Sequence, residues 1–348
     1  MADRTLSHGP ARIALAFFMA VWLAACGPPR NEPMRLAGET MGTTWSLVLS
    51  EPVGVDQVRL QQAIERELVA VNDLASTWQT DSELSLFNAN DSTDWIPVSS
   101  ALHGLLTRAA AITRDSDGAF DATVGPLVNL WGFGPNDVPE RVPEDADIAA
   151  AVALTGPDAL RLRAQPPAAQ KADATVYVDL SALAKGYGVD RVASVLVKQG
   201  LVDFLLEIGG ELLARGQSPR GDAWKIGIER PDAEGRSVHA AVTLPAGGLA
   251  TSGDYRNFFE KDGVRYSHTI DPRTGKPITH QLASVTVHAV DSATADAWAT
   301  ALMVLGEEAG FELAMQREIA AYFLYKDATG FTARVTDTFK PLLDQEPS

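Results

Sequence analysis

The sequence is poor in the residues that build disulfides, zinc sites and nucleic-acid surfaces. Cys26 is the single cysteine among 348 residues, and one thiol cannot form an internal disulfide or a cysteine-based metal site. The six histidines are scattered without the spacing that zinc ligands need. Lys and Arg number 29 against 45 Asp and Glu, a formal net charge of −16. Such a chain repels phosphate backbones, so we expect no nucleic-acid partner, and an anionic ligand would need local cations, a metal or backbone N–H groups.

Several common catalytic motifs are also missing. There is no Gly-x-x-x-x-Gly-Lys-Ser/Thr, no Gly-x-Gly-x-x-Gly after a strand, no His-Glu-x-x-His and no Gly-x-Ser-x-Gly. These absences argue against ordinary P-loop hydrolases, nicotinamide Rossmann enzymes, zincins and α/β-hydrolases. Hydrophobic residues make up 46% and charged residues 21%, which excludes global disorder.

The N-terminus has the pattern of an export signal. The apolar run from Ile13 to Ala25 has 13 residues. As a helix it would rise about 20 Å, short of the roughly 30 Å hydrocarbon core. The run ends in Leu-Ala-Ala-Cys-Gly, which resembles a bacterial lipobox with Cys26 as the lipidated residue. We therefore expect a lipoprotein signal peptide at 1–25, a lipidated tether at 26–35, and anchoring to a membrane on the periplasmic side of the cell envelope. The alternative is a plain signal peptide with an incidental cysteine, and the sequence leaves open which membrane holds the anchor.

The rest of the chain, 36–348, has no linker that would divide it and predicts one large domain. Apolar residues at helical spacing predict helices over 56–76, 99–114, 181–198 and 294–305, the last ending at Gly306, with a further helix near 307–317. Strand-like segments cluster after residue 200 at hairpin spacing, and others are expected at 44–50 and 175–180. The pattern favours an α+β fold of mostly antiparallel sheets with packed helices.

Two polar segments at predicted helices could carry chemistry. Asp179 to Gly188 joins a predicted strand to a helix, and such a junction presents free N–H groups to an anion, with Lys185 adding a cation. Alternatively, Asp179 or Ser181 could simply cap that helix. Asp296 and Thr300 share one face of a helix and offer the oxygen ligands that Mg²⁺ prefers. The plainer alternative, favoured for that pair alone, is a Thr300 hydroxyl bonded back to the Asp296 carbonyl.

Other Gly-rich segments also have two interpretations. Met41-Gly42 is either a tight turn before a strand or a place where a flat ring lies close to the backbone. Asp121 could satisfy its own loop or bind the edge of a heterocycle. Glu207 to Glu211 could line the same cleft, although we favour a turn. His268, among hydroxyl residues, is the best general-base candidate, although a lone histidine is often structural.

Taken together and in order, these segments resemble the ApbE family of FAD:protein FMN transferases. The resemblance spans roughly residues 36 to 340, and seven ordered stretches are far more specific than any one of them. They are MGTTW (41–45), STWQTDSELSLFN (76–88), GAFDATVGPLVNLWGFG (118–134), DLSALAKGYGVD (179–190), TSGDYR (251–256), SHTIDPRTG (267–275) and ADAWAT (295–300).

The resemblance implies an ApbE-like (T-fold-like) domain that binds FAD and Mg²⁺ and splits the pyrophosphate. The FMN half would pass to a Thr or Ser hydroxyl of an acceptor protein of a membrane redox complex, with release of AMP. By motif position, His268 would deprotonate that hydroxyl. The residues implied to contact FAD are Met41, Trp78, Ala119, Phe120, Asp121, Asp179, Lys185 and Ile270. The residues implied to hold the metal are Ala182 and Ala299 through main-chain oxygens, and Asp296 and Thr300 through side chains.

Trp78 departs from the family pattern. Many members have Tyr at this position, where a residue closes over the isoalloxazine ring, and the hydrolytic members differ there. The resemblance therefore leaves two alternatives: a metal-dependent FAD pyrophosphatase, in which water replaces the acceptor hydroxyl, and a flavin-binding lipoprotein without catalysis.

Overall fold

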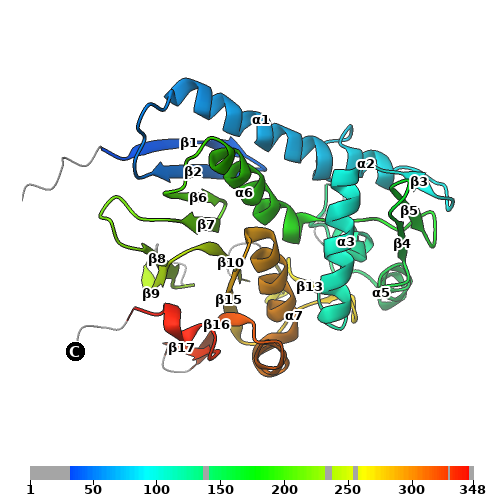
Figure 1. Ribbon diagram of the computed structural model, residues 1–348. Coiled ribbons are helices and arrows are strands. Elements are labelled where there is room, and N and C mark those ends of the chain that lie inside the picture. Colours follow the sequence, from blue (N-terminus) through cyan, green and yellow to red (C-terminus); the bar gives the residue numbers. More distant parts are fainter. Residues whose placement is uncertain (1–31, 136–140, 232–236, 254–257, 328–329, 345–348) are drawn as a thin grey trace, which may run out of the picture. The chain divides into compact units, whose positions relative to one another are not determined.

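An eight-stranded antiparallel sheet organises the computed structural model, which describes residues 32–135, 141–231, 237–253, 258–327 and 330–344. The strand order is β1-β2-β6-β7-β10-β15-β16-β17 (Figure 1). The bounds are β1 (Met34–Thr40), β2 (Thr43–Leu49), β6 (Phe204–Ile208), β7 (Glu211–Arg215), β10 (Gly247–Gly253), β15 (Leu282–Ala289), β16 (Ala320–Asp327) and β17 (Gly330–Val335). The α+β class with antiparallel pairing is confirmed, and the described residues belong to one compact unit.

Helices cover one side of this sheet. α6 (Ser181–Lys198) packs against α7 (Ser292–Gln316), and α7 in turn lies on β10 and β15 (Figure 1). α1 (Gln57–Ala75) packs on α6, and α3 (Ser100–Asp115) contacts both α1 and α7. The predicted helices at 56–76, 99–114 and 181–198 are confirmed to within a residue or so, because their apolar faces are the faces that the sheet and its neighbours bury.

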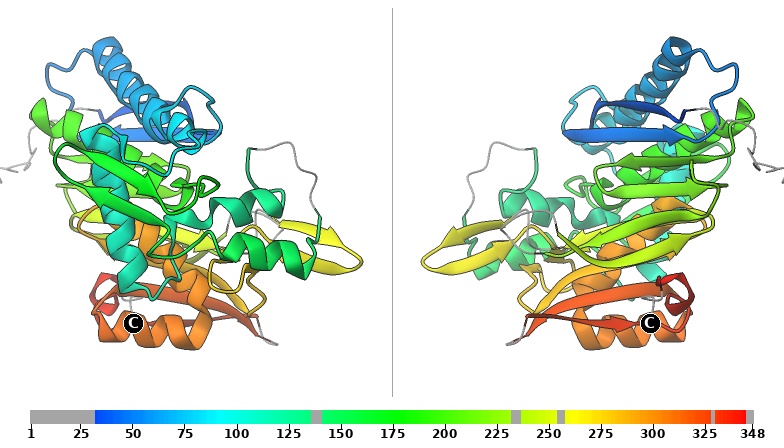
Figure 2. Two further views of the ribbon diagram at one scale, coloured as in Figure 1. Left: turned by 90° about the vertical axis from the view of Figure 1, so that its right-hand side faces the viewer. Right: turned by 90° about the vertical axis from the view of Figure 1, so that its left-hand side faces the viewer.

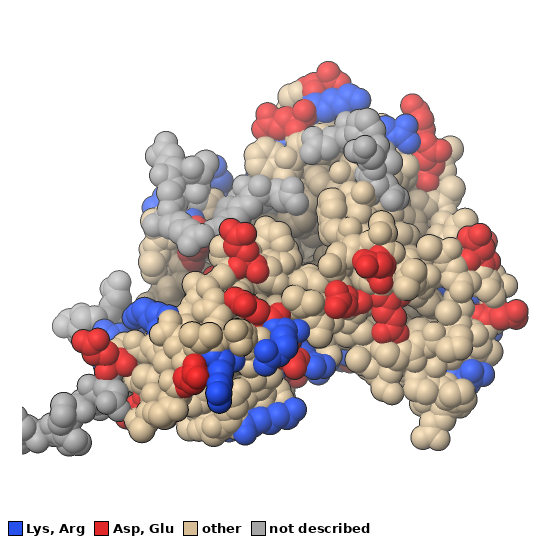
Figure 3. Space-filling model, turned by 90° about the horizontal axis from the view of Figure 1, so that it is seen from above, with Lys and Arg blue, Asp and Glu red and all other residues tan. Residues whose placement is uncertain are grey.

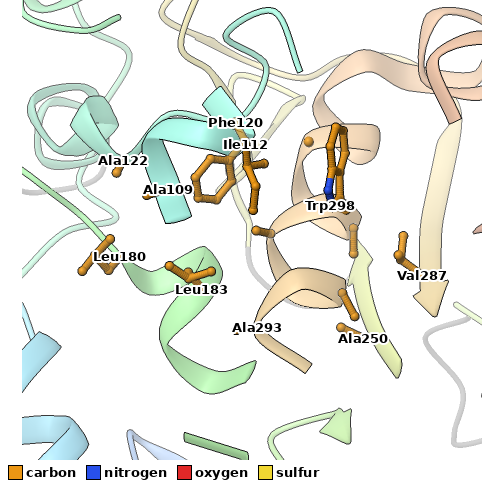
Figure 4. Close-up of a cluster of buried hydrophobic side chains, with 14 of the residues drawn as sticks. Ala109, Ile112, Phe120, Ala122, Leu180, Leu183, Ala250, Val287, Ala293 and Trp298 are labelled. Atoms are coloured by element: carbon orange, nitrogen blue, oxygen red, sulfur yellow. The ribbon is translucent and has the colours of Figure 1, made fainter. Parts of the chain in front are cut away.

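The largest core cluster lies between α3, α6, α7 and the sheet. Phe120 and Leu183 point toward it from the loop after α3 and from α6, while Trp298 comes from α7 (Figure 4). Strand alternation then separates two faces: Ala250 of β10 belongs to this cluster, whereas its neighbour Leu249 belongs to a second cluster on the opposite face. That second cluster includes Trp224 and other residues of the hairpin formed by β8 (Trp224–Glu229) and β9 (Val238–Leu244).

Smaller elements complete the chain. The hairpin of β11 (Phe258–Lys261) and β12 (Val264–Ser267) projects from the main sheet (Figure 2) and packs on α4 (Gly125–Leu130) and α5 (Asp145–Val152). The others are α2 (Glu83–Asn88), η1 (Ala122–Val124), β3 (Ile96–Pro97), β4 (Leu160–Arg163), β5 (Ala168–Lys171), β13 (Ile270–Asp271), β14 (Lys276–Pro277) and η2 (Lys340–Leu342).

The strand predicted at 175–180 is wrong. The segment joins no sheet, because a side chain takes the place of a neighbouring strand. The Asn88 amide donates to the Val178 carbonyl at 2.8 Å and accepts from the Val178 N–H at 2.8 Å, while the Asp179 N–H donates to the Ala122 carbonyl at 2.7 Å. The backbone groups that a ladder would satisfy are therefore already paired.

α7 has the break that the sequence predicts at Gly306. The two helical segments run into one another there, but Gly306 itself has a φ of 79° and interrupts the helix. In the described ranges no helix has both the length and the hydrophobicity needed to cross a bilayer. Acidic side chains are spread over the face seen in Figure 3 rather than gathered at one place. Cys26 and the expected signal peptide lie outside the described residues.

Candidate active site

A cavity of about 680 Å³ opens between the N-terminal ends of α6 and α7, the β6–β7 turn and the loops around η1 and β13. It gathers residues that are far apart in the chain. The predicted site residues that line it are Trp78, Ala119, Phe120, Asp121, Asp179, Ala182, Lys185, His268, Ile270, Asp296 and Thr300. Met41 and Ala299 are the two predicted residues that do not line it.

The two residues outside the cavity lining pack against core residues, Met41 partly buried and Ala299 fully buried. Met41 has a φ of 50° at the turn between β1 and β2, and its side chain packs against a third core cluster, which includes Ile208. The Cβ that Gly188 lacks would lie 3.0 Å from the Met41 methyl carbon, so Met41 rests directly on α6. Ala299 is 1% exposed on the buried side of α7.

The close contact of α6 and α7 positions Asp296. A Cβ on Gly186 would lie 2.4 Å from the Ser292 carbonyl oxygen, so only glycine allows the two helices to approach this closely. At that spacing the Gly186 N–H donates to Asp296 Oδ2 at 3.1 Å. Asp296 is 4% exposed and is held at the cavity wall.

Lys185 lies between two buried carboxylates. Its Nζ is 3.0 Å from Glu211 Oε1 and 3.8 Å from Asp296 Oδ1. Glu211 begins β7, lines the cavity and is 4% exposed. The sequence favours a plain turn over 207–211. The structure has that turn, but it also directs the Glu211 carboxylate into the cleft, so this residue was missed.

Burial and mutual charge set the pKa values of the trio formed by Lys185, Glu211 and Asp296. Desolvation raises the pKa of Asp296, although Lys185 and the Gly186 N–H oppose the change. Desolvation likewise raises the pKa of Glu211 to about 7, with Lys185 opposing it and Asp296 adding to it. Burial alone would lower the pKa of Lys185, but the two carboxylates outweigh it and raise that pKa well above its ordinary value. Lys185 therefore stays charged.

Thr300 follows Asp296 by one helical turn, and its hydroxyl is available to a ligand. Within the residues that the structure describes, that hydroxyl makes no hydrogen bond, so the back-bond to the Asp296 carbonyl that the sequence analysis weighed is not formed. A carboxylate and a hydroxyl on one wall of a cavity suit a hard cation.

The fit of a divalent cation can be tested on the donor set. Among the described residues no group of three or more His, Cys, Asp or Glu could hold a metal ion. A cation at Asp296 would therefore depend on hydroxyl and main-chain oxygens and on oxygens of the bound substrate. Lys185, Glu211 and Asp296 fit this, because two carboxylates and one ammonium leave a net negative charge when all three are ionised. In addition, Glu211 Oε2 is buried and has no hydrogen-bond partner in the part of the chain that the structure describes.

Two further carboxylates line the cavity while supporting their own loops. Asp121 accepts hydrogen bonds from the Thr123 N–H and hydroxyl at 2.8 and 2.7 Å, and from the Gly156 N–H at 2.5 Å. Desolvation raises the pKa of Asp121 and these bonds oppose the change. Asp179 accepts from the Ser181 N–H at 2.8 Å at the start of α6. Both residues thus have a structural role and a position on the cavity wall.

His268 and Trp78 complete the cavity wall. His268 follows directly on β12 and meets Phe133 edge-on, with ring centroids 6.4 Å apart and an interplanar angle of 72°. Ile270, two residues on, is buried. Trp78 is 68% exposed, which leaves its ring open to a ligand or a partner surface.

Comparisons with known proteins show the family of the chain. Residues 41–323 match the ApbE family. The chain is 43% identical to the FAD:protein FMN transferase of Vibrio cholerae, covering 96% of this chain and 98% of that one, and 41% identical to that of Haemophilus influenzae, covering 95% and 97%. It resembles the solved flavin transferase ApbE of Vibrio cholerae with a TM-score of 0.83 at 43% identity, covering 90% of this chain and 99% of the other. The apo flavinyl transferase ApbE of Pseudomonas stutzeri gives 0.83 at 39%, covering 91% and 99%.

Proposed function

The chain belongs to the ApbE family, and on that premise we propose that it transfers FMN from FAD to a Thr or Ser hydroxyl of an acceptor protein. One observation carries the proposal. A single cavity brings together Lys185, His268 and Asp296 with the flavin-motif residues around Asp121, although four separate segments supply them.

The reaction exchanges a phosphoanhydride bond of FAD for a phosphate ester bond to the acceptor. The acceptor oxygen forms a bond to the FMN phosphorus, the bridging P–O bond of FAD breaks, and AMP leaves with the bridging oxygen. His268 takes the proton of the acceptor hydroxyl, because imidazole titrates near neutral pH. Lys185 offers its ammonium to the pyrophosphate oxygens in a chain whose net charge of −16 would otherwise repel them.

We propose that the enzyme uses Mg²⁺. Asp296, the Thr300 hydroxyl and main-chain oxygens of Ala182 and Ala299 would hold it, and it would supply charge neutralisation at the pyrophosphate. Asp296 is suited to this role because the Gly186 N–H orients its carboxylate at the cavity wall. The single α7 turn from Asp296 to Thr300 fixes the spacing of the two donors.

We also propose that the protein works as a lipoprotein on the periplasmic side of the envelope, anchored through Cys26. The lipobox-like sequence before Cys26 supports this. The acceptor would then be a protein of a membrane redox complex with its hydroxyl exposed on the same side.

Incubation of the protein with FAD, Mg²⁺ and a candidate acceptor domain tests the proposal. We expect flavin fluorescence on the acceptor band in a denaturing gel, with one AMP released per FMN attached. His268→Ala should lower the labelling rate at least about a hundredfold, the usual contribution of a general base, whereas His103→Ala on α3 should label normally. Release of free FMN and AMP without labelling would identify a pyrophosphatase instead, and bound FAD without AMP would identify a non-catalytic flavin carrier.

A further inference from the structure

The half-buried Lys185 side chain has two carboxylate partners, and its ammonium is closer to Glu211, which the sequence does not single out. Nζ lies 3.0 Å from Glu211 Oε1 but 3.8 Å from Asp296 Oδ1. Glu211 and Asp296 are both 4% exposed. Lys185 lines the same cavity wall as these two residues. The position of this single ammonium therefore decides how much negative charge remains at Asp296.

The β6–β7 turn holds Glu211 in place. Gly209 and Gly210 have φ values of 62° and 108°, a backbone course that favours glycine at both positions. Ile208 and Glu211 pair across the turn. Glu211 is the first residue of β7, so its carboxylate lies at the end of this strand pair. A Cβ on Gly209 would lie 2.8 Å from Thr43 and 3.4 Å from the Lys185 Cδ. The turn is thus packed against the Lys185 stem as well as paired with its charge.

An ammonium and a divalent cation compete for the same carboxylate. A Lys185 that paired fully with Asp296 would neutralise it and occupy the space beside it. A Lys185 held by Glu211 leaves Asp296 with the Gly186 N–H on one oxygen and its other oxygen 3.8 Å from the ammonium, beyond hydrogen-bond distance.

We propose that Glu211 is a positioning residue that holds the Lys185 ammonium away from Asp296 and so keeps the Asp296 carboxylate available to a divalent cation. This inference rests on the cation site of the proposed function. It does not require that Glu211 touch the cation. Glu211 Oε2 has no hydrogen-bond partner among the described residues, so direct ligation by Glu211 is the competing explanation that the experiment must separate.

Mn²⁺ binding to the full chain, measured by electron paramagnetic resonance without FAD or acceptor, provides the test. We compare the wild type with Glu211→Gln, Lys185→Met and the double variant. Glu211→Gln keeps the size of the side chain and removes its charge, so Lys185 should shift onto Asp296 and the Mn²⁺ dissociation constant should rise by about tenfold or more, the range of effects for residues that orient metal ligands. Lys185→Met should bind Mn²⁺ at least as tightly as the wild type.

The double variant separates the two explanations. With Lys185 gone there is nothing to hold aside, so Glu211→Gln should no longer weaken binding. The double variant should therefore bind within about twofold of Lys185→Met, a tolerance that corresponds to about 0.4 kcal/mol. A double variant as weak as Glu211→Gln would overturn the proposal in favour of direct ligation.

Two other outcomes also decide. Equal affinities of the wild type and Glu211→Gln would overturn this inference while leaving the cation site intact, whereas a wild type that binds no Mn²⁺ would overturn both. Should Glu211→Gln fail to fold, Lys185→Met still decides, because weaker binding there contradicts competition for Asp296.

Discussion

The contact between α6 and α7 at Gly186 makes the sharpest structural prediction. The Cβ of an alanine at this position would lie 2.4 Å from the Ser292 carbonyl oxygen, 2.6 Å from its carbon and 2.7 Å from the Ala293 Cα. All three are backbone atoms in the first turn of α7, so no side-chain rotation relieves the clash. Gly186→Ala must therefore push the two helices apart.

The expected magnitude follows from two opposing effects. Glycine to alanine inside a helix stabilises by about 1 kcal/mol, whereas overpacking costs about 1–3 kcal/mol and reaches the upper end where backbone must move. We expect a net loss of about 1–2 kcal/mol, and each kcal/mol lowers the melting temperature by about 1–2 °C in a chain of this size. The Gly186 N–H to Asp296 bond, now 3.1 Å, would lengthen, and acceptor labelling should fall more than tenfold.

Thermal unfolding and acceptor labelling of three variants check this reasoning. Gly104→Ala on α3 is the matched control, because a Cβ there meets nothing within 4 Å and should stabilise the protein. Gly188→Ala meets the Met41 methyl carbon at 3.0 Å, the mobile end of a side chain, and should change little. A Gly186→Ala variant that melts and labels like Gly104→Ala would refute the predicted clash.

Two other predictions concern the supports of the site. Asn88→Ala should destabilise the fold by about 1–3 kcal/mol for each of the two Val178 backbone groups left unpaired. In thermal unfolding, the control variant Asn90→Ala, at an exposed position, should change the melting temperature far less. Equal melting temperatures of the two variants would contradict this prediction. Burial raises the pKa of Asp190 from 3.8 to about 6, against opposing hydrogen bonds from the Ser292 and Ala293 N–H groups at the start of α7. Because the pKa of Asp190 is higher in the folded state, its protonation stabilises the fold fully below pH 3.8, and this stability is lost as pH rises through about 6. The difference of about 2 pKa units corresponds to about 3 kcal/mol. The melting temperature of the wild type relative to Asp190→Asn should therefore fall between pH 4 and 7, and a pH-independent difference would contradict the prediction.

The sequence predicted elements well where burial is one-sided. Leu60, Ile64 and Leu68 recur at helical spacing, and they are buried on α1 because that helix rests on the sheet by one face only. The segment at 175–180 has the composition of a strand, and its prediction failed for a tertiary reason. Asn88, about ninety residues earlier in the chain, supplies the hydrogen bonds that a partner strand would have made, and no local pattern reports that.

The site divides in the same way. Asp296 and Thr300 could be proposed from sequence because their relationship is internal to one helix. Glu211 could not, because its importance comes from the approach of β7 to α6, which places its carboxylate 3.0 Å from Lys185. The available signal was a charged residue directly after two glycines at the end of a buried strand. That signal fits a turn equally well.

The small residues of α7 connect the packing to the chemistry. Asp296 is the single charged residue among the buried positions of α7, and Ala295 and Ala297 flank it. These small side chains let the helix be enclosed by α6, β10 and β15, and the same enclosure raises the pKa of Asp296. A carboxylate in that position stays ionised only if donors and cations reach it. Gly186 provides the donor by close approach, and Lys185 provides part of the positive charge. A divalent cation would neutralise the remaining negative charge of Lys185, Glu211 and Asp296. The helix spacing that buries Asp296 is therefore also the reason that a cation would stabilise this carboxylate.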